Sequence, residues 1–271
     1  MKKNNNIRLD IELVNRKLYN SRTSAQRAIM AGLVRVNDVV VDKPGTFIKP
    51  EDIIEIKEEA FEYVSRGGLK LEKALKTFNI SVRGLLCMDV GASTGGFTDC
   101  LLRNGAHKVY AIDVGYGQLA WNLRNHPKVI VMERTNIRYL KREQIPDVIH
   151  LCTIDVSFIS LKLVLPVVKN FLYSDGKIIC LVKPQFEAGR DKVGKKGVVR
   201  DKNVHKDILI TLVDYCTDIE LPAQDLTFSP ITGPKGNIEF LLMLSNGKDN
   251  PVMVKYDKIE RVVDESHSVL L

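Results

Sequence analysis

The sequence lacks most of what a secreted, membrane-spanning or metal-binding protein would need. Its five cysteines are odd in number and widely spaced, so they form no Cys-x-x-Cys pair and no disulfide framework. No apolar run approaches the roughly 20 residues of a membrane helix, and the basic start of the chain has no apolar segment behind it. We therefore predict a cytosolic protein without a bound metal, whose reduced thiols are buried: Cys87, Cys100, Cys152, Cys180 and Cys216.

Positive charge is in modest excess, and its distribution is uneven. The 271 residues carry 40 Lys and Arg against 33 Asp and Glu, a formal charge of +7. Residues 1–36 hold eight basic residues and two acids, whereas residues 37–62 hold three basic residues and eight acids. A second basic run lies between Gly189 and Lys206. This segregation favours a polyanionic partner that contacts the N-terminal region and one later loop.

The N-terminal part of the chain predicts a small α+β domain of two helices followed by a β-hairpin. Leucines recur at helical spacing in Leu9–Leu18, and Ser21 or Ser24 can cap a second helix. Two valine-rich runs flank Asn37-Asp38, a dipeptide typical of hairpin turns. A domain of this size is marginally stable alone. We place it at residues 1–59 and a short linker at residues 60–65.

This segment resembles the small RNA-binding module named after ribosomal protein S4. The resemblance lies in Arg-Leu-Asp at 8–10, Ser-Arg at 21–22, Ala25, Gly32, Val-Asn at 36–37 and Lys-Pro at 43–44. It implies basic helices that lie on an RNA backbone and add affinity and orientation rather than base choice. The RNA contacts expected here are Arg8, Arg16, Lys17, Arg22, Arg27 and Arg35.

From residue 66 to residue 271, strand-like and helix-like segments alternate. Strands that alternate with helices form a mostly parallel sheet covered on both faces. The predicted fold class is therefore α/β, a Rossmann-like domain with a mostly parallel seven-stranded sheet. Its strand-like runs are Leu85–Val90, Val109–Val114, Val129–Met132, Val148–Ile154, Ile178–Val182, Leu226–Phe228 and Phe240–Leu244.

A glycine-rich turn follows the first of these strands. Its Gly-x-x-x-Gly-Gly spacing differs from the Gly-x-Gly-x-x-Gly of dinucleotide sites. A carboxylate at Asp89 would repel pyrophosphate but attract the ammonium group of S-adenosylmethionine. Asp113 ends the second strand, where an acid accepts hydrogen bonds from a ribose diol, and Asn136 after the third can bond the adenine edge. The predicted S-adenosylmethionine site is Asp89, Gly91, Ala92, Ser93, Thr94, Gly95, Gly96, Phe97, Asp113, Asn136 and Asp155.

Four further ionisable residues are Lys70, Asp155, Lys183 and Glu239, of which Asp155 and Lys183 directly follow apolar strands. A charge in such a place needs a partner, and two lysines with two acids supply mutual ones. With Gly-Ala-Ser-Thr-Gly-Gly-Phe at 91–97, Asp-Val-Ser-Phe-Ile-Ser at 155–160 and Val-Lys-Pro-Gln-Phe-Glu at 182–187, nearly the whole chain resembles the TlyA (hemolysin A) family of ribosomal RNA 2′-O-methyltransferases. The resemblance implies a Lys-Asp-Lys-Glu catalytic tetrad on these four residues. It also implies cytidines of ribosomal RNA, in RNA or ribosomal subunits, as the substrate.

The chemistry of ribose methylation suits these residue types. Methyl transfer is an in-line displacement, so the site must aim a ribose oxygen at the methyl of S-adenosylmethionine, which leaves as S-adenosylhomocysteine. The 2′-hydroxyl is a poor acid, and we assign Lys183 to accept or steer its proton. The sulfonium and Lys70 favour a neutral Lys183, whereas Asp155 and Glu239 oppose this by pairing with the lysines.

A glycine- and lysine-rich loop, Gly189–Val198, follows the Lys183 strand. Its composition suits a lid that closes on RNA, and it equally suits a merely solvated loop. The RNA contacts expected from this domain are Arg66, Arg190, Lys192, Lys195 and Lys196. We favour a monomer with no membrane partner.

Other functions are less well supported. An adenine N6-methyltransferase would need Asp/Asn-Pro-Pro-aromatic where this chain has Asp155-Val156-Ser157-Phe158. A cytosine C5 enzyme needs a nucleophilic cysteine, and Cys152 lies inside an apolar strand. A membrane-lytic protein, which the hemolysin name suggests, would need an export signal or a spanning segment. A non-catalytic RNA-binding protein stays open as an alternative.

Overall fold

The computed structural model describes residues 6–19, 21–30, 32–56, 63–189, 192–194, 197–247, 251 and 253–271, without the side chains of Arg27 and Met30. Contacts divide the chain into two compact units, Met1–Phe61 and Glu62–Leu271. Of the expected linker, residues 60–62 lie outside the described residues. Tyr63 is buried in the second unit, and Val64 donates its backbone N–H to Asp99 Oδ2 at 2.9 Å. The second unit therefore includes residues 63–65.

The first unit packs two helices against short antiparallel strands. β1 pairs with β4, and a second sheet has the order β3-β2-β5. Its apolar core contains Leu9, Leu13 and Ile29, none of which is exposed. The elements are β1 (Ile7–Arg8), α1 (Leu9–Asn15), α2 (Arg22–Met30), β2 (Val34–Val36), β3 (Val39–Val40), β4 (Phe47–Ile48) and β5 (Ile54–Ile56).

The local predictions for this unit are largely confirmed. Asn37 and Asp38 connect β2 to β3 with φ of +50° and +66°, the left-handed values that a two-residue hairpin turn requires. Ser21 caps α2, because its Oγ accepts the backbone N–H of Ser24 at 3.2 Å. The expected helical position of Leu18 is wrong, since α1 ends at Asn15 and the Leu18 side chain is 42% exposed.

A buried carboxylate joins the two helices of the first unit. Asp10 is fully buried on α1, and Arg8 donates to both of its oxygens at 3.0 Å. From α2, Arg22 Nε donates to Asp10 Oδ2 at 2.9 Å and Gln26 Nε2 at 2.7 Å. These donors, Arg8 foremost, hold the pKa of Asp10 far below its usual value. The carboxylate is therefore a structural centre of the unit.

Replacing Asp10 with asparagine is expected to destabilise the first unit by about 1–3 kcal/mol, the usual value of hydrogen bonds to a charged group. Because the folded-state pKa is lowered, the stabilisation is present above the ordinary pKa of aspartate and is lost as the pH falls through and below it. Urea titrations of the full chain, followed by amide NMR signals of residues 6–56 at pH 7 and pH 3, measure both effects. Equal midpoints for the two proteins at pH 7 would contradict this role.

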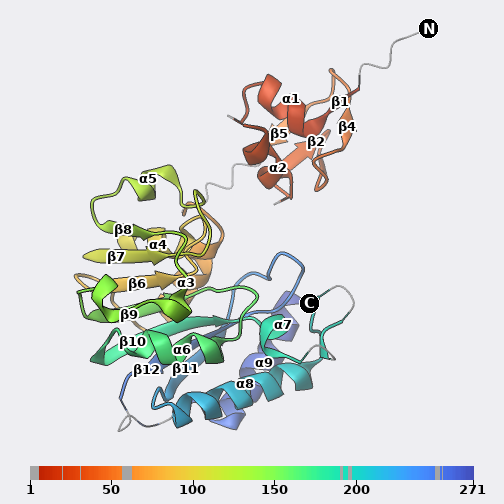
Figure 1. Cartoon of the computed structure of the whole chain (residues 1–271). Coiled ribbons are helices and arrows are strands. Elements are labelled where there is room, and N and C mark those ends of the chain that lie inside the picture. The colour runs from red at the N-terminus through yellow and green to blue at the C-terminus, as the bar shows by residue number, and fades with distance from the viewer. Residues whose placement is uncertain are drawn as a thin grey trace. The chain divides into compact units, whose positions relative to one another are not determined.

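The second unit is a seven-stranded sheet in the order β11-β12-β10-β9-β6-β7-β8, and Figure 1 shows the strands side by side. All neighbours are parallel except β12, which runs antiparallel to β10 and β11. The predicted fold class is confirmed. The strands are β6 (Leu86–Val90), β7 (Lys108–Ile112), β8 (Val129–Met132), β9 (Ile149–Ile154), β10 (Leu172–Val182), β11 (Ala223–Phe228) and β12 (Phe240–Ser245).

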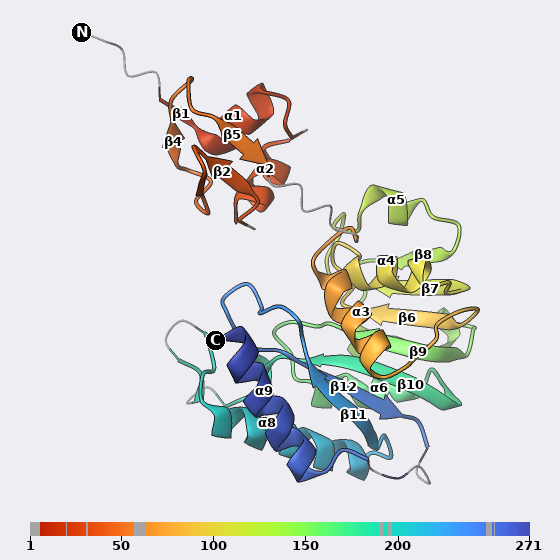
Figure 2. The same cartoon turned by 180° about the vertical axis from the view of Figure 1, so that it is seen from behind.

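Helices cover both faces of this sheet (Figures 1 and 2). Alternate strand residues such as Cys87 and Leu151 form one apolar cluster with α3 and α4, whereas Met88 and Cys152 belong to another with α6, α8 and α9. All five cysteines are buried and free, as predicted. No helix in the described part of the chain is long and apolar enough to cross a membrane. The helices are α3 (Gly67–Thr77), α4 (Gly96–Arg103), α5 (Trp121–Arg124), α6 (Leu165–Lys169), α7 (Pro184–Glu187), α8 (Lys202–Asp218) and α9 (Tyr256–Leu270), with 3₁₀ turns η1 (Ile137–Tyr139), η2 (Arg142–Gln144) and η3 (Leu161–Leu163).

Strand pairing positions the residues that follow the strands. β6, β9 and β10 are parallel, so their carboxyl ends lie at one edge of the sheet. The last pair of the antiparallel ladder between β10 and β12 is Val182 with Phe240. Lys183 follows Val182, and Glu239 precedes Phe240, so the two lie at the same edge. Residues that are 56 positions apart in the sequence are thereby neighbours in the sheet.

Candidate active site

The glycine-rich turn after β6 brings two backbone segments into close approach. Gly91 has a φ of +86°, and a Cβ added there would lie 2.5 Å from the carbonyl oxygen of Asp155. The backbone N–H of Asp155 in turn donates to Val90 O at 2.9 Å. Only glycine tolerates both this dihedral angle and this contact. The turn thus fixes the start of the segment after β9 against the end of β6.

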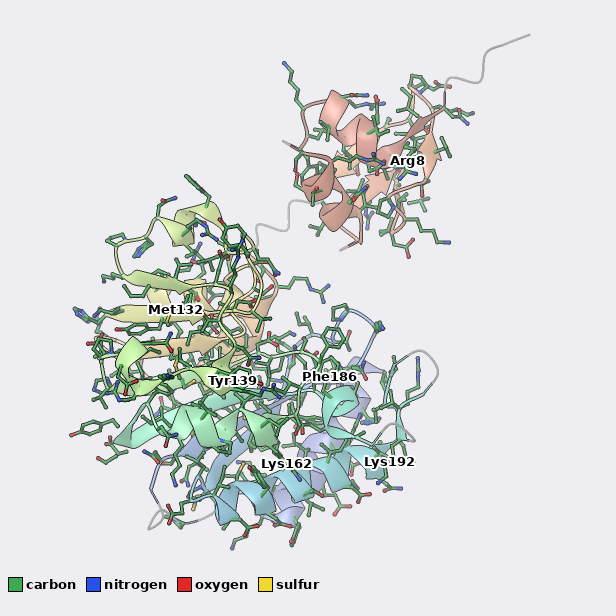
Figure 3. All side chains as sticks on the ribbon, viewed as in Figure 1. Arg8, Met132, Tyr139, Lys162, Phe186 and Lys192 are labelled. Carbon is green, nitrogen blue, oxygen red and sulfur yellow. The ribbon has the colours of Figure 1, made fainter. Side chains whose placement is uncertain are left out.

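A cavity of about 980 Å³ opens at this edge, over the ends of β6, β7 and β9. Such a volume lies in the range of cofactor sites. Figure 3 labels Phe186, one of the side chains that line it. Of the predicted cofactor residues, the cavity is lined by Gly91, Ser93, Asp113, Asn136 and Asp155.

Asp113 and Asn136 lie where the ends of β7 and β8 meet the cavity. Asp113 Oδ2 accepts the backbone N–H of Ser93 at 2.8 Å, and its Oδ1 accepts that of Gly115 at 2.7 Å. A carboxylate offers about four lone pairs, so both oxygens can accept further hydrogen bonds. Asn136 Oδ1 accepts the N–H of Arg138 at 3.1 Å and caps η1. Both side chains are therefore held in place by the backbone.

Asp89 has a different position from the one expected. It is fully buried beneath the turn, where its carboxylate accepts hydrogen bonds from Thr98 Oγ1 at 2.7 Å and from Thr153 Oγ1 at 3.1 Å. Burial raises the pKa of Asp89 to about 7. Asp89 does not line the cavity, so the expected contact with the ammonium group of a ligand is not seen. The remaining predicted turn residues, which also do not line it, are Ala92, Thr94, Gly95, Gly96 and Phe97.

The four predicted tetrad residues form two ion pairs. Lys183 Nζ lies 2.5 Å from Asp155 Oδ1, and Lys70 Nζ lies 2.6 Å from Glu239 Oε2. The Glu239 side chain is 1% exposed and that of Lys70 10% exposed, so this second pair is buried. Lys183 also donates to Ser157 Oγ at 3.0 Å. The structure thus pairs each lysine with one acid at the same edge of the sheet.

Several lining residues were not predicted. Gln185 lies on α7, and within the described part of the chain its buried Oε1 has no hydrogen-bond donor. Phe158 is 90% exposed with a φ of +64°, and its ring centroid lies 5.0 Å from that of Phe186. Ser157 and Gln118 also line the cavity. The Asp-Val-Ser-Phe-Ile-Ser and Val-Lys-Pro-Gln-Phe-Glu motifs contain four of these residues, but a motif does not show which side chains face a cavity.

The predicted RNA-binding residues are partly engaged within their own units. Besides Arg8 and Arg22, Arg16 pairs with Glu12 at 2.8 Å and donates to the carbonyls of Asp52 and Pro50. In the second unit, an Arg66 nitrogen lies 3.5 Å from Thr232 O and Lys192 Nζ lies 3.6 Å from Asp207. Lys17 follows α1, and Arg35 lies on β2. Arg190, Lys195, Lys196 and the side chain of Arg27 lie outside the described residues.

Neither a metal site nor a reactive thiol is found in the residues that the structure describes. No group of three or more His, Cys, Asp or Glu side chains among them could hold a metal ion. Burial raises the pKa of the Cys152 thiol well above its usual value. A nucleophilic cysteine therefore has no candidate at this end of β9.

Known proteins share both units. Residues 63–246 match the model of the FtsJ-like methyltransferase family, and residues 7–54 match that of the S4 domain. YqxC of Bacillus subtilis, a candidate rRNA methyltransferase, is 50% identical over 97% of this chain and 95% of its own. The 16S/23S rRNA (cytidine-2′-O)-methyltransferase TlyA of Mycobacterium tuberculosis is 42% identical over 95% of this chain and 97% of its own. The solved structure of a candidate hemolysin from Streptococcus thermophilus has 44% identity and a TM-score of 0.79, and covers 97% of this chain and 96% of that one.

Proposed function

The chain belongs to the FtsJ-like methyltransferase family, and on this premise we propose that it methylates the ribose 2′-hydroxyl of a cytidine in ribosomal RNA, with S-adenosylmethionine as donor. The family predicted from the motifs is confirmed, and the TlyA relative is named for this activity. The observation that carries the proposal is the Lys183–Asp155 pair, whose carboxylate lines the cavity beside the glycine turn. It sets a lysine nitrogen and a carboxylate beside a cofactor-sized space.

The residues around the cavity suit S-adenosylmethionine. Asp113 can accept hydrogen bonds from the ribose diol, and Asn136 can bond the adenine edge. Gly91 leaves room for a close approach to the backbone. Gln185 Oε1, which accepts no hydrogen bond from the residues that the structure describes, can take a donor from a ligand. When bound, S-adenosylmethionine supplies a methyl group on a positively charged sulfur.

The lysines and acids of the chain handle the ribose hydroxyl. Lys183 Nζ, in its neutral form, accepts the 2′-hydroxyl proton as the oxygen takes the methyl group. Asp155 and Ser157 hold this nitrogen at the cavity through contacts of 2.5 and 3.0 Å. Lys70 and Glu239 add a second, buried pair at the same edge. Most of the catalytic effect then comes from positioning rather than from covalent chemistry.

The first unit supplies RNA affinity in this proposal. Arg8 and Arg22 contact Asp10, yet a guanidinium has five N–H donors, so each keeps donors for phosphate oxygens. Arg16, Lys17, Arg27 and Arg35 extend the basic set in the first unit. Arg66, Arg190, Lys192, Lys195 and Lys196 extend it in the second. Phosphate contacts of this kind position the RNA without reading its sequence.

The direct test is to incubate the protein with ribosomal subunits, or their naked RNA, and methyl-labelled S-adenosylmethionine. Digestion to nucleosides and mass spectrometry then separate 2′-O-methylcytidine from base-methylated nucleosides. We expect label in 2′-O-methylcytidine alone. Label on a base would favour a base methyltransferase, and RNA binding without any transfer would favour a non-catalytic RNA-binding protein.

Replacing Asp113 with alanine is expected to weaken S-adenosylmethionine binding by about 10- to 100-fold, because one hydrogen bond to a charged group contributes about 1.5–3 kcal/mol. Isothermal titration calorimetry with S-adenosylmethionine measures the change. Asp175→Ala, at an exposed position of β10, is the matched control and should bind like the original protein. An unchanged dissociation constant for the Asp113 variant would remove this carboxylate from the cofactor site.

A further inference from the structure

We propose that Glu187 is a positioning residue for the methyl transfer, and this inference rests on the function proposed above. Glu187 ends α7, four residues after Lys183. It joins the segment after β10 to the segment after β9, residues 155–160, which contains Asp155. The proposal requires no contact between Glu187 and the substrate or the cofactor. Its role is to fix the distance between the lysine and the acid that pairs with it.

Both oxygens of the Glu187 carboxylate accept hydrogen bonds from residues at the end of the segment after β9. Ser160 Oγ donates to Glu187 Oε2 at 2.6 Å, and the backbone N–H of Leu161 donates to Oε1 at 2.8 Å. At the start of the same segment, Asp155 contacts Lys183 at 2.5 Å. The two segments are therefore joined at both ends, once by the catalytic pair and once by Glu187.

The segment between these two connections is strained. Phe158 has a φ of +64°, in the left-handed region that strains the backbone of a bulky residue. Such a conformation persists only where the surroundings enforce it. Gly91 fixes the segment at Asp155, and Glu187 fixes it at Ser160 and Leu161. Ser157, the second contact of Lys183, lies next to the strained residue.

The surroundings of Glu187 suit a structural connection better than a surface charge. The side chain is half-buried, and burial raises its pKa above the usual value, although the hydrogen bonds from Ser160 and Leu161 and the charge of Lys162 lower it. Its two bonded donors are a hydroxyl and a backbone N–H, both neutral. A carboxylate held in this way has a defined geometry because each oxygen has its own donor. Loss of the side chain would release both donors at once.

The test compares Glu187→Ala and Glu187→Gln in the full-length enzyme. Alanine removes both bonds, and we expect kcat to fall by about 10- to 100-fold, since misplacement of a reacting group by about 1 Å can cost 100-fold. The dissociation constant of S-adenosylmethionine should change by less than about threefold. Glutamine can accept from Leu161 N–H and donate to Ser160 Oγ, which has a second lone pair, so it should restore kcat to within about threefold.

A matched control separates positioning from general stability. Asp147, like Glu187, accepts two hydrogen bonds. Its donors are Lys108 Nζ at 2.6 Å and Tyr110 Oη at 2.7 Å, and Asp147 does not line the cavity. Asp147→Ala should lower the melting temperature but leave kcat per folded molecule unchanged. Glu187→Ala should lower kcat even when measured well below its melting temperature.

Hydrogen exchange supplies a readout that needs no activity. In Glu187→Ala, the amide of Leu161 and the peptide that spans residues 156–161 should exchange faster, whereas β9 itself should be unaffected. A Glu187→Ala protein with the original kcat and exchange pattern would overturn the proposal, as would a Glu187→Gln protein as impaired as the alanine variant. An original enzyme that transfers no methyl to ribose would instead overturn the function proposed above, and faster exchange in the alanine variant would still be expected.

Discussion

Replacing Lys183 with methionine is expected to lower kcat for 2′-O-methylation by about 10²- to 10⁴-fold, the range that a positioned general base contributes. Methionine keeps much of the side-chain length but cannot accept the hydroxyl proton. Because Lys183 is not among the residues that line the cavity, S-adenosylmethionine binding should change little. Single-turnover assays with labelled donor and ribosomal subunits measure the rate, and calorimetry measures the binding.

Lys177→Met supplies the control for this experiment. Lys177 lies on the same strand, β10, at an exposed position in the middle of the strand. The same substitution there should leave the rate within about twofold of the original. If the Lys183 variant also keeps the original rate while it binds the donor normally, the ribose hydroxyl loses its proton to another group, and the role assigned to Lys183 is wrong.

The second large effect is expected from Lys70→Met, which leaves the Glu239 carboxylate, 1% exposed, without its ion-pair partner. Breaking a buried pair from one side costs about 3–5 kcal/mol. For a unit of this size, that corresponds to a fall in melting temperature of roughly 6–20 °C. Differential scanning calorimetry of the full chain measures it. Methyl transfer should fall as well, because the pair is part of the proposed tetrad.

Two further variants show whether the charge or the packing matters. Lys76→Met changes the same helix, α3, but its partner Glu72 forms an exposed pair, so the melting temperature should move by no more than about 2–4 °C. The double variant Lys70→Met with Glu239→Leu removes both buried charges and should recover most of the lost stability without recovering activity. If the Lys70→Met protein is as stable as the original, the loss of the ion pair with Glu239 does not destabilise the unit, and this prediction is wrong.

The sequence predicted a mostly parallel sheet and four ionisable residues that supply mutual partners, but not which lysine pairs with which acid. Parallel strands end at one edge, so Asp155 and Lys183, each directly after an apolar strand, were expected at the same edge of the sheet. The pairing of β9 with β10 then makes them neighbours. Glu239 could be added only from the family resemblance, because its approach depends on the antiparallel pairing of β12. Strand periodicity alone does not fix which strands are neighbours.

The misplacements have equally specific causes. The sequence could not show that Asp89 points into the core, because its partner Thr153 is 64 residues away. The strand β10 begins at Leu172, whereas the sequence predicted a start at Ile178. The prediction was wrong because Tyr-Ser-Asp-Gly-Lys at 173–177 has the composition of a turn. The sequence did not predict the hydrogen bonds of Glu187 either, because their donors, like Thr153 for Asp89, lie far away in the sequence. The donors to Glu187 come from a segment 26 and 27 residues earlier in the chain.

The antiparallel pairing of β10 with β12 decides where the second unit tolerates a change in the number of residues. A loop beyond the ladder tolerates it, and the paired strands do not. The ladder ends away from the catalytic edge, where Lys177 pairs with Ser245, the last residue of β12. Residues inserted after Ser245 lengthen a loop and leave the ladder in place. A single residue gained or lost inside β10 would instead turn every following side chain to the opposite face, and would carry Lys183 out of the site. The loop at this end of the sheet can therefore vary in length, provided that the number of residues in the strands stays the same.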